Sequence, residues 1–272
     1  METGMNSAID YHQWKEEHKT ILDTFSDKNV MMLFSGGKDS SLALDFILRA
    51  KKEFGFDFSA HGGAYPVHRY PSKEKKMIES YWNKRGIDIH WYDLGETDDY
   101  IKNEINPCLK CQKLRKKILK TILGDMVDDW ESLVLVTGYS LWDIVSYSIE
   151  HILNDFFSNS IDPGDNKRFM ETAQRFYPLL RMKEGYTVFR PLIKYNSNSI
   201  QKVITQAGIQ TLSTPCKFKE FRPKRILGRY YQRMEICFDY DKVFDFAKRS
   251  LGLPDVATYT AIDRDEYLLN IF

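Results

Sequence analysis

A six-residue glycine loop, Ser35-Gly36-Gly37-Lys38-Asp39-Ser40, constrains the fold of this chain more than any other feature. It follows a short, continuous apolar run, Asn29 to Phe34, of the kind that forms a strand buried on both faces of a parallel sheet. Apolar residues at helical spacing come directly after it, at positions 43, 46, 47 and 50. The loop therefore lies at the carboxyl end of a strand, where open α/β sheets bind their ligands.

The same alternation of strand and helix continues along the chain. Further strands are predicted at 56–60, 88–94, 133–137 and 186–192, and helices at 8–26, 72–85, 107–123, 142–157 and 197–207. Such strands pair in parallel through right-handed crossovers. We predict a doubly wound α/β fold with a mainly parallel five-stranded sheet, in which 158–185 is an insertion or lid. The expected parts are an N-terminal helical segment 1–28, an α/β domain 29–215 and a helical C-terminal extension 216–272 packed on it.

Composition limits the class of protein. The 272 residues are 43% hydrophobic and 28% charged, as in globular proteins, which argues against disordered and fibrous chains. No apolar run approaches the ~18–20 residues of a membrane helix, and the polar first residues carry no secretory signal. We expect a cytoplasmic protein with no membrane partner. Its four cysteines are then free thiols, metal ligands or catalysts rather than a disulfide framework.

The glycine loop has the chemistry of an anion site. Gly36 and Gly37 let the backbone approach a phosphate closely, and the first N–H groups of the following helix attract it. Lys38 adds a positive charge, whereas Asp39 is unusual beside phosphates and indicates Mg²⁺. The hydroxyl donors around the loop are those of Ser35, Ser40 and Ser41. An ordinary serine-capped glycine turn is the alternative interpretation.

The loop is not a Walker A motif, because Met32 stands where that motif needs glycine. The hexapeptide SGGKDS instead resembles the pyrophosphate-binding loop of the N-type ATP pyrophosphatases, the PP-loop superfamily. These enzymes cleave ATP between the α and β phosphates and adenylate a substrate oxygen, after which a nucleophile displaces AMP. The resemblance implies an adenine nucleotide alpha hydrolase-like fold with 29–215 as the ATP pyrophosphatase domain. It also implies that Lys38, Ser35 and Ser40 contact the pyrophosphate directly.

Three of the four cysteines stand at predicted helix starts. Cys108 and Cys111 form a C-x-x-C motif after an Asn-Pro pair, and Cys216 follows Thr-Pro. The helix dipole and neighbouring lysines should favour their thiolates. Three thiolates suit an iron–sulfur cluster with one open iron site, persulfide carriers or zinc with an uncertain fourth ligand. Two ordinary helix cysteines are the alternative for the C-x-x-C motif, and Cys237 is expected to lie in the core.

The order of the motifs narrows the resemblance. After the loop come P-C-x-x-C with a basic run, T-G-x-x-x-x-D at 137–143, F-R-P-L at 189–192 and P-C at 215–216. This is similar to the tRNA 2-thiocytidine and 2-thiouridine synthetases over roughly residues 29–230. The resemblance implies that Gly138 packs against the nucleotide and that Asp143 is a catalytic or Mg²⁺-linked acid. It further implies that a 4Fe-4S cluster with a catalytic role is held by three cysteines, Cys108, Cys111 and Cys216.

The chain departs from that pattern at three positions. Tyr139 replaces a histidine, Trp142 replaces an aspartate, and Lys219 stands where the 2-thiocytidine enzymes have the last cysteine of a second C-x-x-C. The zinc-binding cysteine ends of the 2-thiouridine enzymes are also missing. These departures leave the substrate open.

Two basic runs begin at the cysteines. Cys108–Lys120 contains six basic residues and no acid, and Cys216–Arg233 contains seven against Glu220. Because the net charge of the chain is only +1, the remainder is acidic. If the cysteines converge, both runs converge on one mouth that would hold tRNA phosphates, with Tyr230 and Tyr231 stacking on a base. Solvated helix faces are the alternative.

The sequence therefore predicts an ATP-dependent tRNA sulfurtransferase. ATP and Mg²⁺ would bind at 35–41, a base carbonyl oxygen would be adenylated, and sulfur from a donor would displace AMP. One alternative is a PP-loop enzyme that activates a sugar or nucleobase for amidation or thiolation. Another is an inactive nucleotide-sensing or RNA-binding module. The oligomeric state, including a homodimer, is left open. The resemblance to the superfamily also implies that Gly62 to Ala64 line the adenine pocket. We expect His61, His68 and His90 to be structural or surface residues.

Overall fold

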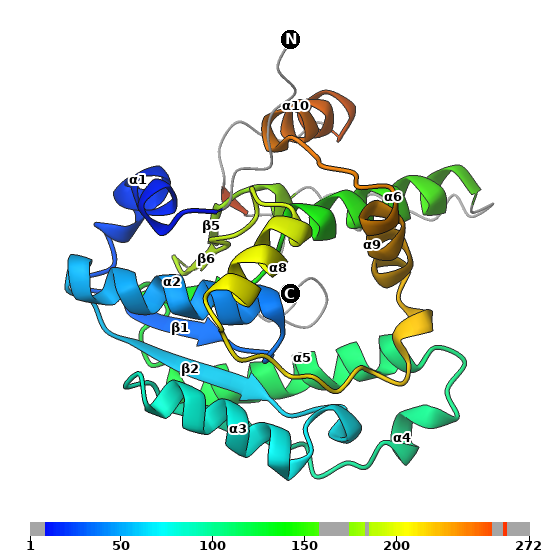
Figure 1. The fold of residues 1–272 in the computed structure, drawn as a ribbon, viewed down its shortest axis with the longest axis horizontal. Helices are drawn as coiled ribbons and strands as arrows, with labels where there is room; N and C mark the ends of the chain where they lie inside the picture. Colours follow the sequence, from blue (N-terminus) through cyan, green and yellow to red (C-terminus); the bar gives the residue numbers. More distant parts are fainter. Residues whose placement is uncertain (1–8, 158–173, 183–184, 252–257, 260–272) are drawn as a thin grey trace.

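The computed structural model describes residues 9–157, 174–182, 185–251 and 258–259. A central sheet is covered by helices (Figure 1). In chain order its strands β1 to β7 are Asn29–Leu33, Phe58–Gly63, Ile89–Tyr92, Leu133–Thr137, Leu179–Met182, Thr187–Phe189 and Thr258–Tyr259. They lie side by side in the order β3-β2-β1-β4-β6-β5-β7, and in the described sheet only the β5–β6 pair is antiparallel.

The α-helices follow the predicted alternation. They are α1 Tyr11–Leu22, α2 Lys38–Phe54, α3 Ser72–Asn83, α4 Asp99–Lys102, α5 Pro107–Met126, α6 Leu141–Phe157, α8 Ser197–Gln206, α9 Pro223–Arg233 and α10 Tyr240–Leu251. Short 3₁₀ turns lie at Val67–Arg69, Gln174–Phe176 and Lys219–Phe221. Among the described helices, none is long and apolar enough to cross a membrane.

The predicted fold class is confirmed, and the sheet is larger than expected. Two strands, β5 and β7, extend the five predicted ones. β5 lies within the segment 158–185, which was expected to be an insertion or lid. This part of the segment is instead a strand of the sheet, because it pairs with β6. Residues 158–173 and 183–184 of that segment lie outside the described residues. The domain boundaries at 28/29 and 215/216 remain predictions.

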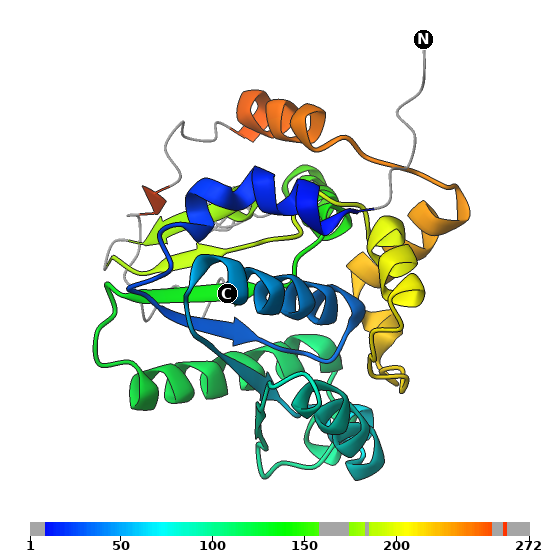
Figure 2. The same cartoon turned by 60° about the vertical axis from the view of Figure 1, so that its left-hand side comes forward.

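Alternation along β1 explains the two helical layers. Val30 and Met32 face a core that also contains side chains of α1, α2, α3 and α8, whereas Met31 faces a second core with Leu123 of α5. Successive strand residues point to opposite faces, so an all-apolar strand needs helices on both sides. Figure 2 shows α2 and α5 on opposite sides of the sheet.

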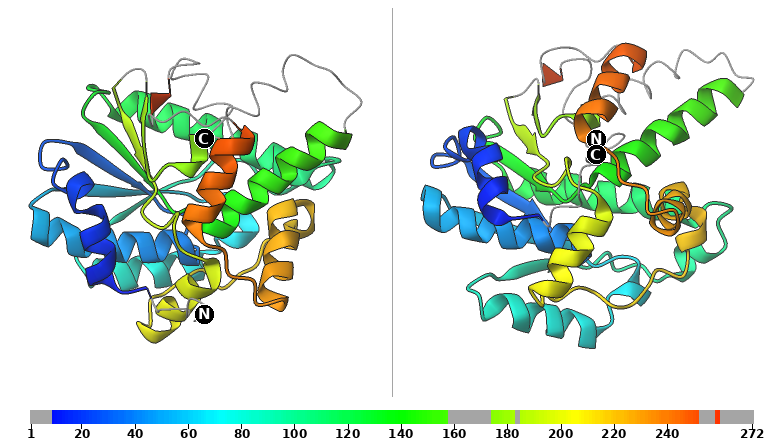
Figure 3. Two further views of the ribbon diagram at one scale, coloured as in Figure 1. Left: turned by 90° about the horizontal axis from the view of Figure 1, so that it is seen from above. Right: turned by 45° about the horizontal axis from the view of Figure 1, so that its top comes forward.

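The carboxyl ends of the central strands finish at one level. Leu33 of β1 is paired with His61 of β2 and with Thr137 of β4. The strand order reverses between β1 and β4, so their carboxyl ends open the crevice where doubly wound sheets bind ligands. The C-terminal helices α9 and α10 lie beside α6, which follows β4 (Figure 3).

Candidate active site

The glycine loop, Ser35 to Ser40, is predicted to bind phosphate, and we call it the phosphate loop from here on. It closes on itself through short-range contacts. Ser40 Oγ donates to the Gly37 carbonyl oxygen at 3.0 Å and accepts from the Ser35 N–H at 3.2 Å. Gly36 has a φ of +68°, and a Cβ there would lie 2.6 Å from Cδ1 of Leu212. The left-handed backbone conformation favours glycine at this position, and a larger residue would also have to displace the Leu212 side chain.

Lys38 is held by two polar side chains. Its Nζ lies 2.5 Å from Asp39 Oδ1 and donates to the hydroxyl of Ser197, the first residue of α8. Ser197 was not predicted as a site residue, because no spacing in the sequence links α8 to the loop. The buried hydroxyls of Ser41 and Thr137 have no hydrogen-bond partner among the described residues. These unpaired donors at the loop and the end of β4 fit a site for a polar ligand such as a nucleotide.

Gly138 lies directly against the start of α2. A Cβ at this position would lie 2.7 Å from the Ser40 backbone nitrogen and 2.8 Å from its Cα. Because backbone atoms cannot move aside easily, glycine is what allows β4 to end so close to the phosphate loop. Its predicted contact with the nucleotide remains a prediction.

Asp143 joins α6 to the C-terminal helix α9. Its Oδ2 accepts hydrogen bonds from the N–H and hydroxyl of Ser140, both at 3.1 Å, and its Oδ1 accepts from Lys224 Nζ at 2.7 Å. Burial disfavours the charged carboxylate, but Lys224 and the hydrogen bonds outweigh it and lower the pKa of Asp143. Lys224 belongs to the basic run that was predicted to hold tRNA phosphates. The structure instead places it in this largely buried ion pair.

Trp142, one of the departures from the thiolation enzymes, also anchors the C-terminal extension. Its Nε1 donates to Asn196 Oδ1 at 2.9 Å, and its ring meets that of Tyr231 at 5.6 Å. Tyr231 is only 2% exposed, so the prediction that it stacks on a base is wrong. Tyr230, at 54% exposure, remains available.

The cysteines come together from two distant segments. Cys108 and Cys111 lie in the first turn of α5, which Asn106 caps by accepting from the Leu109 N–H at 3.0 Å. Cys216, predicted to stand at a helix start, instead lies in the non-helical residues 212–218, which we call the strap; the next α-helix, α9, begins only at Pro223. Cys108 Sγ donates to the Phe218 carbonyl of the strap at 3.1 Å, and the thiols interact electrostatically. Cys108 therefore contacts the strap two residues beyond Cys216, and a site formed by all three cysteines remains a prediction.

The expectation that the thiolate is favoured is wrong for Cys108 and Cys111. Burial raises the pKa of Cys108 to about 11, although Arg222 opposes the shift. Burial also raises the pKa of Cys111 against the effect of Arg115. The cause is that both thiols lose water, which costs the charged form more than the helix start and nearby cations return. Cys237, expected in the core, is exposed.

The positive charges around the cysteines suit a group that is bound by thiolates, such as a metal or an iron–sulfur cluster. The positions of the described side chains do not form a ligand set for such a group. Both basic runs face them, through Arg115 from one and Arg222 and Arg225 from the other, and Arg69 joins from the turn after β2. Among the described residues, however, no three His, Cys, Asp or Glu side chains form a metal-ligand arrangement. The sequence did not single out Arg69. Other basic residues pair locally, Lys110 with Glu104 at 3.3 Å and Arg229 with Glu220 at 2.6 Å.

The remaining predictions near β2 have mixed outcomes. His61 is buried, which lowers its pKa to about 4, and it bonds Tyr92 and Ser59 as a structural residue. The ring of Trp91 packs directly on Gly62, because a Cβ added to Gly62 would lie 2.6 Å from ring atoms of Trp91. The predicted adenine pocket at Gly62–Ala64 remains a prediction.

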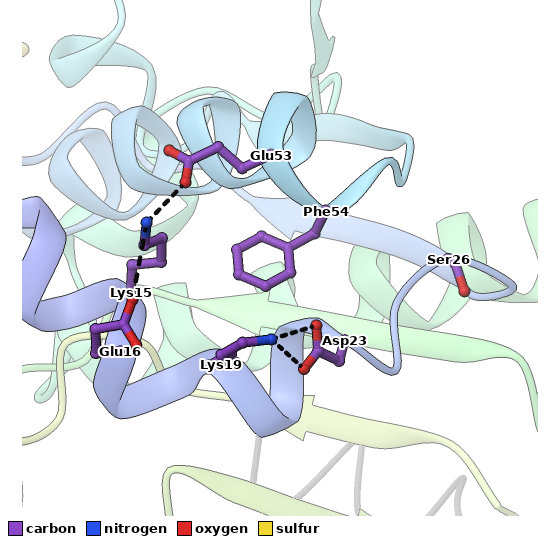
Figure 4. Close-up of a pocket in the computed structure, with 7 residues that line it drawn as sticks. All are labelled: Lys15, Glu16, Lys19, Asp23, Ser26, Glu53 and Phe54. Carbon is purple, nitrogen blue, oxygen red and sulfur yellow. Dashed lines mark hydrogen bonds and ion pairs between the residues drawn. The ribbon is translucent and has the colours of Figure 1, made fainter.

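A surface depression between α1 and the end of α2 is lined mainly by charged side chains (Figure 4). Two of its lysines are already paired, Lys15 with Glu53 at 3.0 Å and Lys19 with Asp23 at 2.8 Å. Glu53 lies fifteen residues beyond Lys38 on α2, roughly 22 Å along a helix. The depression is therefore remote from the phosphate loop, and we assign it no part in the chemistry.

Comparison with known proteins supports the resemblance stated above. No family model matches the chain. An uncharacterized protein of Methanocaldococcus jannaschii is 25% identical over 210 residues, 72% of this chain and 65% of that protein. The tRNA-cytidine(32) 2-sulfurtransferase of Pseudomonas fluorescens is 27% identical over 179 residues, 63% of this chain and 57% of the enzyme. The chain thus spans less than two thirds of the length of these curated relatives.

The fold is also found in a solved structure. The U34-tRNA thiolase NcsA from Methanococcus maripaludis, determined with its 4Fe-4S cluster, matches with a TM-score of 0.63 at 15% identity. The match covers 95% of this chain and 88% of NcsA. The predicted resemblance to the PP-loop superfamily and to its tRNA-thiolating members is confirmed at the level of fold and sequence similarity.

Proposed function

We propose that this chain is an ATP-dependent tRNA sulfurtransferase that replaces the oxygen of a base carbonyl with sulfur. The observation that carries the proposal is the strap, which joins a phosphate loop to the cysteines. At one end the Leu212 N–H donates to the Gly36 carbonyl at 2.8 Å, and at the other Cys108 binds the Phe218 carbonyl. An adenylating site and candidate sulfur carriers therefore share one edge of the sheet.

The phosphate loop serves the first half of the reaction. The base carbonyl oxygen attacks the α-phosphorus of ATP, and pyrophosphate leaves. Lys38 and the serine hydroxyls of the loop stabilise the negative charge that builds up on this leaving group. Mg²⁺ would be held by Asp39 beside the phosphates, and Asp143 is the second acid that the resemblance links to catalysis or to Mg²⁺.

The cysteines serve the second half. A sulfur nucleophile attacks the activated base carbon, and AMP leaves with the former carbonyl oxygen. A 4Fe-4S cluster held by Cys108, Cys111 and Cys216 would, when bound, present an open iron site to sulfur from an external donor. Before that, the neutral thiols must lose their protons, which the facing arginines assist.

Exposed cations at the mouth suit a polyanionic partner. Arg225 and Tyr230 are exposed on α9, and Arg222 is half-buried at its start. Arginine binds phosphate in a bidentate manner, and a tyrosine ring stacks on a base. We infer that tRNA approaches α9 from this side, with an affinity that falls as salt rises.

Mass spectrometry of tRNA nucleosides, from cells with and without the gene, tests the proposal. A thiolated nucleoside that disappears with the gene and returns with the wild-type copy supports it. With purified protein, ATP should be converted to AMP faster when tRNA is present. Turnover that ignores tRNA would instead indicate a small-molecule substrate, and no AMP release under any condition would indicate a binding module.

The cluster has its own test. Protein purified without oxygen should be brown and contain iron, and the Cys108→Ala variant should lose both the colour and the iron. A colourless wild-type protein that contains zinc would overturn the cluster while leaving adenylation untouched.

A further inference from the structure

The strap is held at four places between α8 and α9, where Figure 1 draws it in yellow. Its first bond is to Gly36, described above, and the second is from the Ser213 N–H to Glu74 at 2.9 Å. The Lys217 N–H donates to His68 Nε2 at 2.9 Å, and the Phe218 carbonyl accepts from Cys108. The two residues that follow Cys216 are therefore fixed by His68 and Cys108.

His68 is itself held in one orientation. Asp98, just before α4, accepts the N–H groups of Val67 and His68 at 2.8 and 3.0 Å, and His68 Nδ1 lies 2.7 Å from its carboxylate. A ring that donates from Nδ1 to a carboxylate keeps Nε2 as an acceptor when it is neutral. That acceptor is the atom that meets the Lys217 N–H. The imidazole is 6% exposed, so water does not easily replace it.

The ring also packs against the strap. The His68 and Phe218 rings meet edge to face with centroids 5.6 Å apart. His68 thus contacts both residues after Cys216, one through a hydrogen bond and one through its ring. In the described structure, Asp98 and His68 belong to neither the phosphate loop nor the cysteine set, yet they connect the end of β2 to the strap.

We propose that His68, oriented by Asp98, is a positioning residue that places Cys216 opposite Cys108 and Cys111. The proposal rests on the proposed function only for the use made of the cysteines. The placement itself requires neither ATP nor tRNA. It gives a buried histidine expected to be merely structural a defined role in bringing the distant third cysteine to the other two.

Cross-linking between Cys108 and Cys216 tests the placement directly. The full chain would carry Cys111→Ser and Cys237→Ser, leaving two thiols, and would be kept reduced and free of metal. Dibromobimane becomes fluorescent when both of its arms have reacted, and peptide mapping identifies the joined cysteines. We expect His68→Ala to lower the cross-linked yield about five-fold, the effect of losing one hydrogen bond at a largely buried site.

Two near-isosteric variants separate the acceptor from the ring. His68→Gln can place a carbonyl oxygen near the position of Nε2 and should keep most of the yield. His68→Asn can still reach Asp98 but not Lys217, and should lose as much as His68→Ala. His90→Ala, at an exposed histidine of β3, is the matched control and should cross-link like the parent.

The proposal is overturned if His68→Ala or His68→Asn cross-links as well as the parent, or if His68→Gln loses the yield that His68→Asn loses. Circular dichroism checks that each variant is folded, and the Gln and Asn pair decides the matter if His68→Ala does not fold. Because no step uses ATP or tRNA, a protein that cross-links as expected but thiolates no tRNA would contradict the proposed function alone.

Discussion

The phosphate loop and the cysteine mouth lie on the same edge of the sheet but are built in different ways. By the cysteine mouth we mean Cys108 and Cys111 at the start of α5 together with the strap. The loop closes through contacts within residues 35–40, at the junction of one strand and one helix. The mouth combines the start of α5 with the strap, and the bond from Cys108 to Phe218 spans 110 positions of the chain. Local chemistry therefore determines the first site, and long-range packing determines the second.

The two regions also differ in charge. Lys38 lies beside Asp39, and Asp143 keeps its charge because Lys224 outweighs the cost of burial. At the mouth, burial wins over the arginines and keeps Cys108 and Cys111 protonated. The comparison teaches that a charged site needs a partner within hydrogen-bond distance, whereas more distant cations do not offset the loss of water.

The largest expected effect is a loss of activity, and it should differ in kind between variants of the phosphate loop and variants of the cysteines. Lys38→Ala should lower tRNA-stimulated AMP formation by ~10²–10³-fold, because it removes a charge that stabilises the leaving pyrophosphate. Cys216→Ser should abolish the thiolated nucleoside but leave ATP binding intact. Radiolabelled ATP turnover and nucleoside mass spectrometry measure the two. If Cys216→Ser lost ATP binding as Lys38→Ala does, the regions would not be separate.

A second prediction concerns the protonation of the mouth. The pKa of Cys108 is about 11, whereas that of an ordinary cysteine is about two units lower. At neutral pH, Cys108 therefore forms about 100-fold less thiolate than an ordinary cysteine. Alkylation by iodoacetamide, followed for each cysteine by peptide mass spectrometry, should show Cys108 reacting far more slowly than exposed Cys237. A rate that levels off below pH 8 would contradict the effect of burial.

The same shift makes folding stability depend on pH. An acid whose pKa rises from 9.0 to about 11 on folding holds its proton in the folded state after the unfolded chain has lost it. Its contribution to the free energy of unfolding is thus intact below pH 9 and decreases between pH 9 and 11. Cys108→Ala should reduce that decrease in urea titrations.

Glycine replacement at the loop should have a smaller effect. Gly138→Ala would force a Cβ into the Ser40 backbone, and overpacking of this kind costs ~1–3 kcal/mol. We expect weaker ATP binding, measured by calorimetry, together with a lower Tm. Gly124→Ala is the matched control, because its Cβ would meet nothing within 4 Å on α5. Equal behaviour of the two variants would show that the close approach at Gly138 is unimportant.

The smallest expected change tests the ion pair between Lys224 and Asp143, which joins α9 to α6. Lys224→Met leaves Asp143 without its partner and should lower the free energy of unfolding by ~1–2 kcal/mol. Urea unfolding measures the change. Lys102→Met is the control, because the side chains of Lys102 and its partner Asp99 are 61% and 75% exposed and their ion pair should contribute little.

The same ion pair should make stability depend on pH. Since the pKa of Asp143 is lowered, the contribution of Asp143 to the free energy of unfolding is present above pH 4 and is lost as pH falls further. That acid dependence should weaken in Lys224→Met, and an unchanged pH profile would mean that Lys224 does not hold the carboxylate.

The positions of β1, α2 and the start of α5 were predictable from the sequence, because each depends on residues that are close together in the chain. The apolar run before Ser35, the glycines after it and the helical spacing that follows are all local, and β1 and α2 form where these signals place them. The Asn106-Pro107 pair likewise starts α5 at Pro107 as expected. Tyr231 and Lys224 were misjudged because a helix sequence shows which residues share a face but not which face another helix covers.

The sequence by itself determined the α/β alternation, the glycine loop between β1 and α2, and the start of α5 that carries Cys108 and Cys111, since all of these depend on neighbours a few residues apart. It did not determine the place of Cys216, which lies outside any helix. Only the tertiary structure decided that Ser197 binds Lys38, that Lys224 holds Asp143 and that His68 binds the backbone beside Cys216. It also decided that burial raises the pKa of Cys108 and Cys111. The physical reason is that burial and the distance to charges from other segments set a group's ionisation and partners, and neither is written in the spacing of residues along the chain.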